Sequence, residues 1–264
     1  MPIPDTKLPF SIKVLISDMS DSLFIKGDAK QHALQFSEHL TSTEMVEIYN
    51  PSWNKPIKLK KFILTCKSPV FQKFFTQNSS QVIVDFDYQI CSKFINFLFT
   101  NCTEIKMELL PQLLDVSLNY GTNILTKAIL KQSTKLLKNL KINPLLALEL
   151  AVINAEKSYL SRTMKCLSNV TISDLTTKNI TGVISPETME IILLSNELKI
   201  KELSLIKFYA DWLALTGSTN KFFSLLRTSL LDSDEKTIVL SKYSYIFPKN
   251  SSVSEKIHNN RSFQ

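Results

Sequence analysis

The chain has 264 residues, of which 44% are apolar, and a formal net charge of +7. This apolar content is enough to bury one large core or two ordinary ones. Only four glycines occur, which argues against dinucleotide-binding and phosphate-loop folds, whose turns require glycine. The basic charge attracts nucleic acid or acidic membranes in general, but Lys131, Lys135 and Lys138, with Lys141 nearby, are explained equally well by a solvated helix face. The composition predicts a globular, largely helical protein.

The cysteines indicate a reduced environment. Cys66, Cys91, Cys102 and Cys166 lie far apart and form no Cys-x-x-Cys pair, so neither a zinc site nor a disulfide framework is expected. Met1 is followed by a polar, proline-containing stretch, and no run approaches the roughly 18 apolar residues that span a bilayer. We expect an intracellular protein, in the cytoplasm or alternatively the nucleus, without a cofactor, a metal or a membrane partner.

The N-terminal part of the chain predicts one short strand and one helix with a single apolar face. Pro9 to Ser17 alternates weakly, which is typical of a short strand. From Asp28 to Leu40 the apolar residues recur at steps of four, three and four, so one helix with Asp28 as its cap is predicted. The stripe consists of Ala29, Ala33, Phe36 and Leu40.

A hairpin and two short helices follow. Val46–Tyr49 and Ile57–Leu59 are predicted strands joined by NPSWNKP, whose two prolines push the chain out of a helix. Ser68-Pro69 predicts a new helical turn, with serine as the cap and proline in the first turn. Seven apolar residues crowd around it: Phe62, Ile63, Leu64, Val70, Phe71, Phe74 and Phe75.

The rest of the first half returns to strand and helix signals. Gln81–Phe86 is rich in β-branched residues and predicts a strand. Helices are expected over Tyr88–Phe99, Leu109–Tyr120 and Ile124–Leu140, with Gly121 as a C-terminal cap between the last two.

The second half, from Asn143 to about Phe247, shows only helical periodicity. Pro144 begins a helix through LLALELAVINAE, and further helices are predicted over Tyr159–Leu167, Ile172–Thr176, Thr188–Leu194, Glu202–Leu215 and Lys221–Leu231. The polar tail, 249–264, is predicted to be disordered.

Four segments of the first half resemble the BTB (POZ) domain. LKKFILTCKSPVFQKFF, Leu59–Phe75, is similar to the family's strand end, leucine-rich turn and Ser-Pro-Val-Phe helix start. VIVDF, ICSKFINFLFT and SLNYGTNILTKAILKQSTKLL follow in the family's order. The fold expected is mostly α with a small β-sheet, an α+β BTB domain over 27–141 after an N-terminal extension, 1–26.

The second half is similar to a BACK domain, which often follows BTB in the Kelch-like family. NPLLALELAVINAEKSYLSRTMKCL resembles its opening, and ISPETMEIILLSNELKIKELSLIKFYADWL resembles its later part. The matching positions are Leu193, Leu198, Glu202 and Trp212. The resemblance implies an all-α BACK domain over 142–248. No Kelch repeats are expected, because the chain after Phe247 has neither their length nor their repeat structure.

The resemblance implies homodimerisation, since BTB domains commonly pair through an N-terminal helix. The stripe Ala29, Ala33, Phe36 and Leu40 is the matching position, and a short helix with one apolar face requires a covering surface. Packing of that helix on its own chain is the alternative.

The resemblance also implies a second candidate role, as an adaptor of cullin-3 ubiquitin ligases. Three features of this sequence differ from the pattern usual in that family. Met45 stands where the family usually has Asp, and Lys60 where it has His. Cullin-binding members often carry a hydrophobic residue and a Glu in the loop after Phe75, whereas this candidate partner-contact loop is polar: Thr76, Gln77, Asn78, Ser79, Ser80 and Gln81. An anchor that commonly carries about 2 kcal/mol or more is therefore missing.

No catalytic constellation is visible. His32 and His39 are two helical turns apart, too far to chelate one metal, and His258 lies in the tail. Trp212 is expected in the core, and Trp53 is expected to fold over its own hairpin, with a binding role as the alternative.

The sequence therefore predicts a non-enzymatic scaffold that dimerises and binds an unidentified protein client. A cullin-3 adaptor with a divergent contact loop is the alternative. A nucleic-acid-associated regulator that uses its lysines and aromatic residues is a remote one, because BTB proteins that bind DNA do so through separate zinc fingers.

Overall fold

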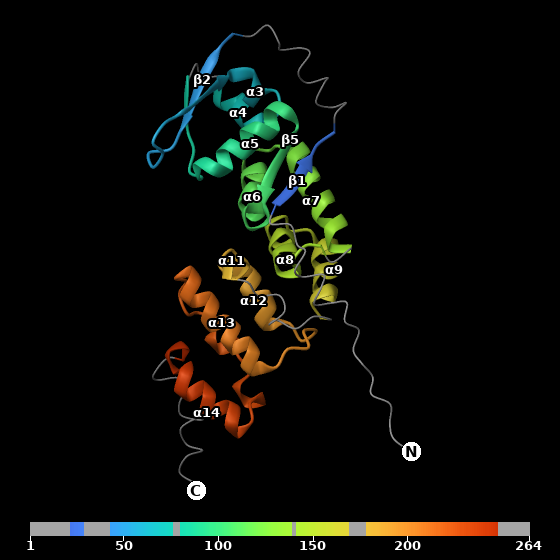
Figure 1. Ribbon diagram of the computed structural model, residues 1–264, viewed down its shortest axis with the longest axis vertical. Coiled ribbons are helices and arrows are strands. Elements are labelled where there is room, and N and C mark those ends of the chain that lie inside the picture. The colour runs from blue at the N-terminus through green and yellow to red at the C-terminus, as the bar shows by residue number, and fades with distance from the viewer. Residues whose placement is uncertain (1–21, 29–42, 76–79, 139–140, 169–177, 248–264) are drawn as a thin grey trace. The chain divides into compact units, whose positions relative to one another are not determined.

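The computed structural model describes residues 22–28, 43–75, 80–138, 141–168 and 178–247. The chain divides into two compact units, and the boundary lies between Asn143 and Pro144 (Figure 1). None of the helices described is long and apolar enough to cross a membrane.

The first unit contains two small sheets. In the larger one, β2 (Met45–Tyr49) lies between β3 (Ile57–Lys60), which is antiparallel to it, and β4 (Gln81–Ile83), which is parallel. The other sheet pairs β1 (Ser22–Lys26) with β5 (Cys102–Lys106) in antiparallel register. Alternate residues of each strand are buried, so each sheet has one core face and one outer face.

The helices of the first unit begin and end at residues suited to their positions. They are α3 (Lys61–Thr65), α4 (Pro69–Phe74), α5 (Tyr88–Thr100), the 3-10 helix Met107–Leu109, α6 (Leu110–Asn119) and α7 (Asn123–Lys138). The Asp87 side chain accepts the Gln89 N–H at 2.6 Å and caps α5, which ends at the left-handed Asn101. Gly121, at φ +65°, separates α6 from α7 as predicted.

Aromatic rings fill the core beneath α4. The Phe71 ring stacks on Tyr120 with centroids 4.5 Å apart, and Phe94 lies 5.9 Å from Tyr120. Phe86 meets both Phe94 and Tyr120 edge to face, at 6.4 and 5.5 Å. This cluster joins α4, α5 and the end of α6, so the position of α4 depends on rings that come from three parts of the sequence.

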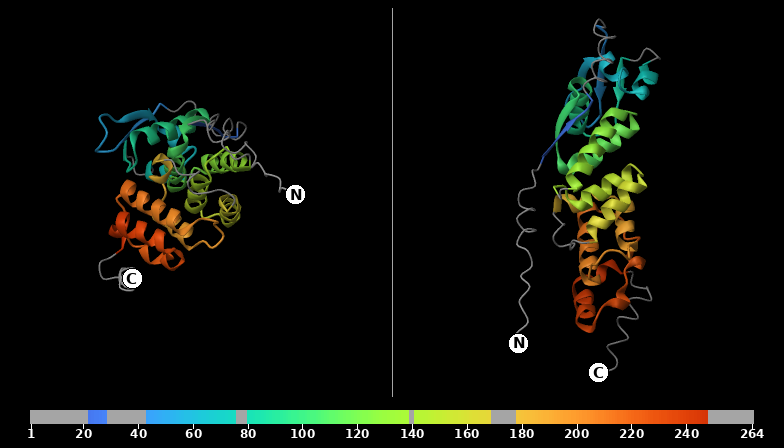
Figure 2. Two further views of the ribbon diagram at one scale, coloured as in Figure 1. Left: turned by 60° about the horizontal axis from the view of Figure 1, so that its bottom comes forward. Right: turned by 90° about the vertical axis from the view of Figure 1, so that its right-hand side faces the viewer.

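The second unit consists of helices. They are α8 (Pro144–Ile153), α9 (Lys157–Leu167), α11 (Lys178–Thr181), α12 (Pro186–Leu194), α13 (Glu202–Thr216) and α14 (Ser233–Lys242), with 3-10 helices at Phe223–Leu225, Thr228–Leu230 and Ser244–Ile246. Within the unit, α8 packs on α9 and α12, and α13 packs on α11 and α14. Figure 2 shows α13 and α14, in orange and red, side by side.

Two side chains anchor the second unit. Trp212 is fully buried, as predicted, and donates its indole N–H to the Ile184 carbonyl at 2.8 Å. The Tyr209 hydroxyl donates to Asn220 Oδ1 at 2.8 Å and accepts the Phe222 N–H at 3.2 Å. Leu193, Leu198 and Glu202 are also buried.

Several predicted elements differ from the structure. Strands β1 and β5 were not predicted, and α14 was also missed. The single helix predicted over Lys221–Leu231 is wrong, because that stretch forms two 3-10 turns. The predicted strand Gln81–Phe86 is shorter, since β4 ends at Ile83. The predicted strand over 9–17, the helix over 28–40, the helix over 172–176 and the tail all fall wholly or mainly outside the described residues.

Candidate protein-interaction surface

The start of α4 is fixed to the end of α6. Ser68 Oγ accepts the Phe71 N–H at 3.1 Å and donates to the Tyr120 carbonyl at 2.5 Å. Pro69 occupies the first turn, where its missing N–H costs nothing. A Cβ atom at Gly121 would lie 3.0 Å from Pro69 Cγ, so glycine allows this close approach as well as the positive φ.

One side of α4 is buried and the other is exposed. Phe71 and Phe75 face the aromatic core, with 1% and 3% of their surfaces exposed, whereas Val70 and Phe74 are 41% and 44% exposed. Each pair is four residues apart, so each forms a stripe along the short helix. Because α4 is anchored by its buried pair, Val70 and Phe74 are held facing outward.

Leu118 of α6 extends this exposed surface. It is 38% exposed, and its carbonyl accepts the Gly121 N–H at 3.0 Å. Gly121 in turn lies against Pro69 and Val70, which places the end of α6 beside α4. We refer to Val70, Phe74 and Leu118 as the α4–α6 patch. Exposed apolar side chains on neighbouring elements are a candidate surface for binding another protein.

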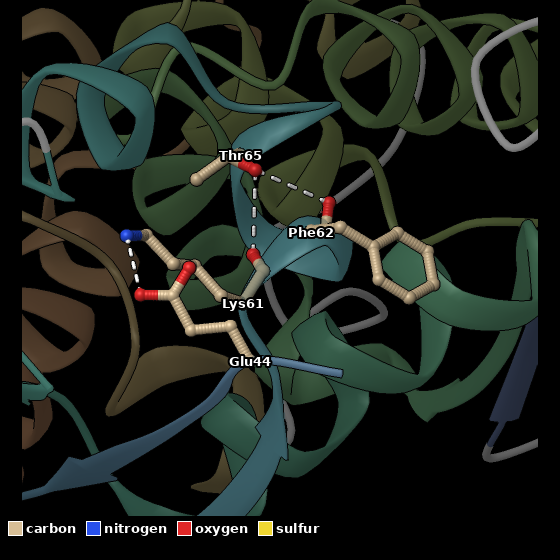
Figure 3. Close-up of polar contacts among 4 residues, drawn as sticks. All are labelled: Glu44, Lys61, Phe62 and Thr65. Atoms are coloured by element: carbon tan, nitrogen blue, oxygen red, sulfur yellow. Dashed lines mark hydrogen bonds and ion pairs between the residues drawn. The ribbon is translucent and has the colours of Figure 1, made fainter. Parts of the chain in front are cut away.

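A second set of contacts fixes α3 to the start of β2 (Figure 3). Lys61 Nζ lies 2.9 Å from Glu44 Oε1, and the Lys61 N–H donates to the Glu44 carbonyl at 2.8 Å. Thr65 Oγ1 lies 3.4 Å from the Lys61 carbonyl and 3.5 Å from the Phe62 carbonyl. The Lys61 ammonium is also 5.4 Å from the centre of the Phe75 ring. The backbone contact does most to fix this position, because an ion pair with an exposed carboxylate contributes little.

The turn between α3 and α4 carries a buried lysine. Lys67 is 7% exposed, and its ammonium lies 5.9 Å from the centre of the Phe97 ring. Burial lowers the pKa of Lys67 to about 8, because the charged form loses its water. Burial also raises the pKa of the neighbouring Cys66 thiol, and that of Cys91 to about 12. These thiols are therefore protonated near neutral pH and unsuited to nucleophilic chemistry.

Part of the predicted contact loop can be placed. Residues 76–79 lie outside the described residues, as do Ala29, Ala33, Phe36 and Leu40 of the predicted dimer stripe. At the end of the loop, the Ser80 carbonyl accepts the Glu47 N–H at 2.9 Å. Gln81 Nε2 donates to Glu47 Oε2 at 3.2 Å, and Lys58 Nζ lies 2.9 Å from Glu47 Oε1. These two loop residues therefore belong to the edge of the β-sheet.

Sequence reasoning missed the α4–α6 patch. Val70 and Phe74 were counted among the crowded apolar residues around Ser68-Pro69, with no distinction between buried and exposed positions. The sequence does contain a sign of this difference, since Val70 and Phe74 form one i, i+4 pair and Phe71 and Phe75 form another. A short helix on a protein surface can bury only one of two such pairs. Leu118 gave no local signal, since its place beside α4 depends on the chain reversal at Gly121.

The remaining candidate groups are the potential metal ligands and Trp53. Among the described residues, no three His, Cys, Asp or Glu side chains are grouped as metal ligands. The histidines at positions 32, 39 and 258 fall outside these residues. Trp53 packs edge to face on Tyr88, with centroids 5.3 Å apart and an interplanar angle of 88°. Its ring thus contacts the start of α5 in addition to belonging to the hairpin turn.

The first unit, with its small sheets and surrounding helices, matches a family of protein-interaction domains. Residues 35–138 match the family model of the BTB/POZ domain. The chain thus combines an α+β BTB/POZ domain with a helical region that follows it. A search of curated proteins found no match.

Proposed function

We propose that the protein is a non-enzymatic scaffold that dimerises through its BTB/POZ domain and binds a protein client. The BTB/POZ match over 35–138 carries the proposal, because this is a protein-interaction domain. The α4–α6 patch supports it, since its apolar side chains are held outward by buried neighbours. The proposed site of action is the cytoplasm, with the nucleus as an alternative.

The helical region after the BTB/POZ domain is proposed to be a BACK domain over 142–248. The resemblance described above supports this, and so does the burial of its matching positions, Leu193, Leu198, Glu202 and Trp212. In this arrangement the helical region supplies further surface for a client.

Dimerisation is tested by changing the apolar stripe at 29–40. We expect Phe36→Asp combined with Leu40→Asp to give a folded monomer, because two carboxylates would oppose burial of the stripe. Light scattering measures the mass, and circular dichroism checks the fold. The matched control is Leu194→Asp with Leu230→Asp, which places the same charges at exposed leucines and should leave a dimer. A double variant at 36 and 40 that stays dimeric contradicts this interface.

Adaptor function for cullin-3 is the second candidate, and the α4–α6 patch is the observation that favours it. Phe74 precedes the 76–81 loop and offers an exposed ring where the loop itself has only polar residues. We expect the N-terminal domain of cullin-3 to bind with micromolar affinity if this candidate is right. Phe74→Asp should then reduce binding by tenfold or more, whereas Phe99→Asp, at another exposed ring, should not.

Absence of cullin-3 binding by a dimeric wild-type chain would remove the adaptor candidate and leave the scaffold. Binding that is insensitive to Phe74→Asp would leave an adaptor with a different contact surface. A monomeric wild-type chain would contradict the dimeric scaffold whatever the cullin-3 result.

A further inference from the structure

Helix α7 exposes a continuous row of lysines. Lys127, Lys131 and Lys135 are four residues apart, Lys138 follows three residues later, and all four are exposed. At about 100° per residue they fall within about 80° of arc, so they share one face. We call them the lysine face. The opposite side of α7 is buried through Leu125, Ile129 and Leu137 among others.

The charges on this face are not balanced. Helix α7 contains no aspartate or glutamate, and none of the three ion pairs found among the described residues includes any of the four lysines. By contrast, α14 mixes Asp234 and Glu235 with Lys236 and Lys242. An ordinary solvated helix face usually carries both signs, as α14 does.

The lysine face weakens its own helix. Positive charges at i and i+4 repel one another, which disfavours the Lys127–Lys131 and Lys131–Lys135 pairs. The helix dipole stabilises cations in the last turn, which accounts for Lys135 and Lys138. That explanation does not extend to Lys127 and Lys131, which lie earlier in the helix. A bound anionic partner would relieve the repulsion along the whole row.

We propose that the lysine face binds an acidic segment of a partner protein, with carboxylates spaced to match the lysines. Successive lysines are about 6 Å apart along the helix axis, and glutamates at i, i+4 and i+8 of an acidic helix have the same spacing. This inference rests on the proposed function, because it takes the partner to be a protein. It adds the chemistry of that partner and a surface separate from the α4–α6 patch.

The exposed side chains favour a protein over two other polyanions. The exposed positions of α7 are Asn123 and the four lysines. They include no aromatic ring to stack on the bases of a single-stranded nucleic acid and no arginine to read a duplex. Apolar side chains near the lysines, such as Ile124 and Leu130, are only partly exposed, so little apolar surface is offered to a membrane. Lysine ammonium groups pair by charge alone with carboxylates as well as with phosphates, so the lack of stacking rings and of arginine is what favours an acidic protein segment.

The test measures peptide binding to the full-length chain by fluorescence anisotropy at about 50 mM salt, where exposed charges are weakly screened. The probe is a labelled 20-residue helical peptide with glutamates at i, i+4, i+8 and i+11. A second peptide has glutamine at those positions. Protein variants are Lys127→Gln/Lys131→Gln/Lys135→Gln and the control Lys199→Gln/Lys201→Gln/Lys207→Gln, which removes the same charge from exposed lysines of the second unit.

We expect binding of the acidic peptide with a Kd of about 1 mM or somewhat below, and none of the glutamine peptide. The α7 triple variant should bind about tenfold more weakly, and the control variant within about twofold of wild type. Equal loss in both variants would reduce the effect to net charge and overturn the proposal, as would no binding by wild type. Tighter, α7-dependent binding of a 20-base-pair duplex or of phosphatidylserine vesicles would overturn it in favour of nucleic acid or a membrane.

Light scattering on the same proteins separates this inference from the proposed function. The α7 variant should remain dimeric, because glutamine preserves the helix and the lysine face lies outside the proposed dimer stripe. A monomeric wild-type chain that still binds the acidic peptide through α7 would contradict the dimeric scaffold and leave the lysine face as a binding surface.

Discussion

The two units bury their polar groups differently. In the first unit, buried hydroxyls make short hydrogen bonds, such as Ser117 Oγ to Thr126 Oγ1 at 2.7 Å and Ser68 Oγ to the Tyr120 carbonyl. No carboxylate is buried among the described residues of that unit. The second unit buries two, Glu149 and Glu202, which are 2% and 6% exposed.

Each buried carboxylate joins distant parts of the second unit. Glu149 Oε2, on α8, accepts the Ser185 N–H at 2.9 Å and the Ser185 hydroxyl at 3.1 Å, just before α12. Glu202, at the start of α13, accepts the Arg227 N–H at 2.6 Å, and Arg227 Nε lies 3.2 Å from its other oxygen.

The comparison indicates different sensitivities for the two units. The surface of the first unit depends mainly on ring packing, which does not change with pH, although the unit also buries Lys67, whose pKa burial lowers to about 8. The second unit depends on charged groups that burial penalises unless their partners remain. We therefore expect the change in stability to decrease from removal of a buried ring, through removal of a charged partner and of a capping hydroxyl, to neutralisation of a buried carboxylate. The ring and the hydroxyl belong to the first unit, and the charged groups to the second.

The largest effect is expected from Phe71→Ala in the first unit. Removing this buried ring leaves a cavity between α4, α5 and the end of α6, which should lower the free energy of unfolding by about 3–5 kcal/mol. Chemical denaturation measures the change. Phe99→Ala, at a ring that is 54% exposed, is the control and should cost much less. Equal losses would show that the cluster does not organise the unit.

The next effect is expected from Arg227→Met in the second unit. Glu202 would keep its backbone donor but lose its cation, so the unit should lose about 2 kcal/mol, less than for a fully buried pair because Arg227 is partly exposed. Arg162→Met, at an exposed arginine of α9, is the control. Adding Glu202→Gln should recover part of the loss, and a double variant with additive losses would contradict the coupling.

Local patterns predicted the regular helices well. The bounds of α5, α6 and α13 differ by one residue from those expected, because apolar periodicity and nearby caps define them. The 3-10 turns at 223–230 were not predictable in this way. Glu202 binds the Arg227 N–H from 25 residues away, and this contact competes with the helical hydrogen bond that the periodicity suggested.

Long-range pairing explains the other omissions. Strand β5 was missed because its partner, β1, lies about 80 residues earlier, and neither strand carries a strong signal alone. The α4–α6 patch depends in the same way on the contact between Ser68 and Tyr120, which are 52 residues apart. The predicted dimer stripe remains a prediction, as do the domain bounds.

A smaller effect is expected from Ser68→Ala in the first unit. The change removes the cap of α4 and leaves the Tyr120 carbonyl without this donor, which should cost about 1–2 kcal/mol. Thermal denaturation and the anisotropy of a label near α4 measure stability and local order. Ser92→Ala, at an exposed position of α5, should change neither. An unchanged stability at position 68 would show that ring packing alone holds α4.

The smallest effect is the pH dependence caused by Glu149 in the second unit. Burial raises the pKa of its carboxyl above the usual 4.5, Glu187 adds to this, and hydrogen bonds from Thr188 and Ser185 oppose it. The folded chain therefore holds this proton more tightly than the unfolded chain does. The contribution of this group to stability should fall as the pH rises from about 4.5 through the folded-state pKa.

Glu149→Gln should remove this dependence. The variant should match wild type near pH 4 and be more stable than it by under about 1 kcal/mol near pH 8, provided that the amide oxygen still accepts the Ser185 N–H. Glu190→Gln, at an exposed position of α12, should leave the pH profile unchanged. A wild-type profile that keeps its slope in Glu149→Gln would assign the dependence to another group. A variant less stable than wild type near pH 8 would mean that the charged carboxylate binds the start of α12 strongly enough to outweigh its burial.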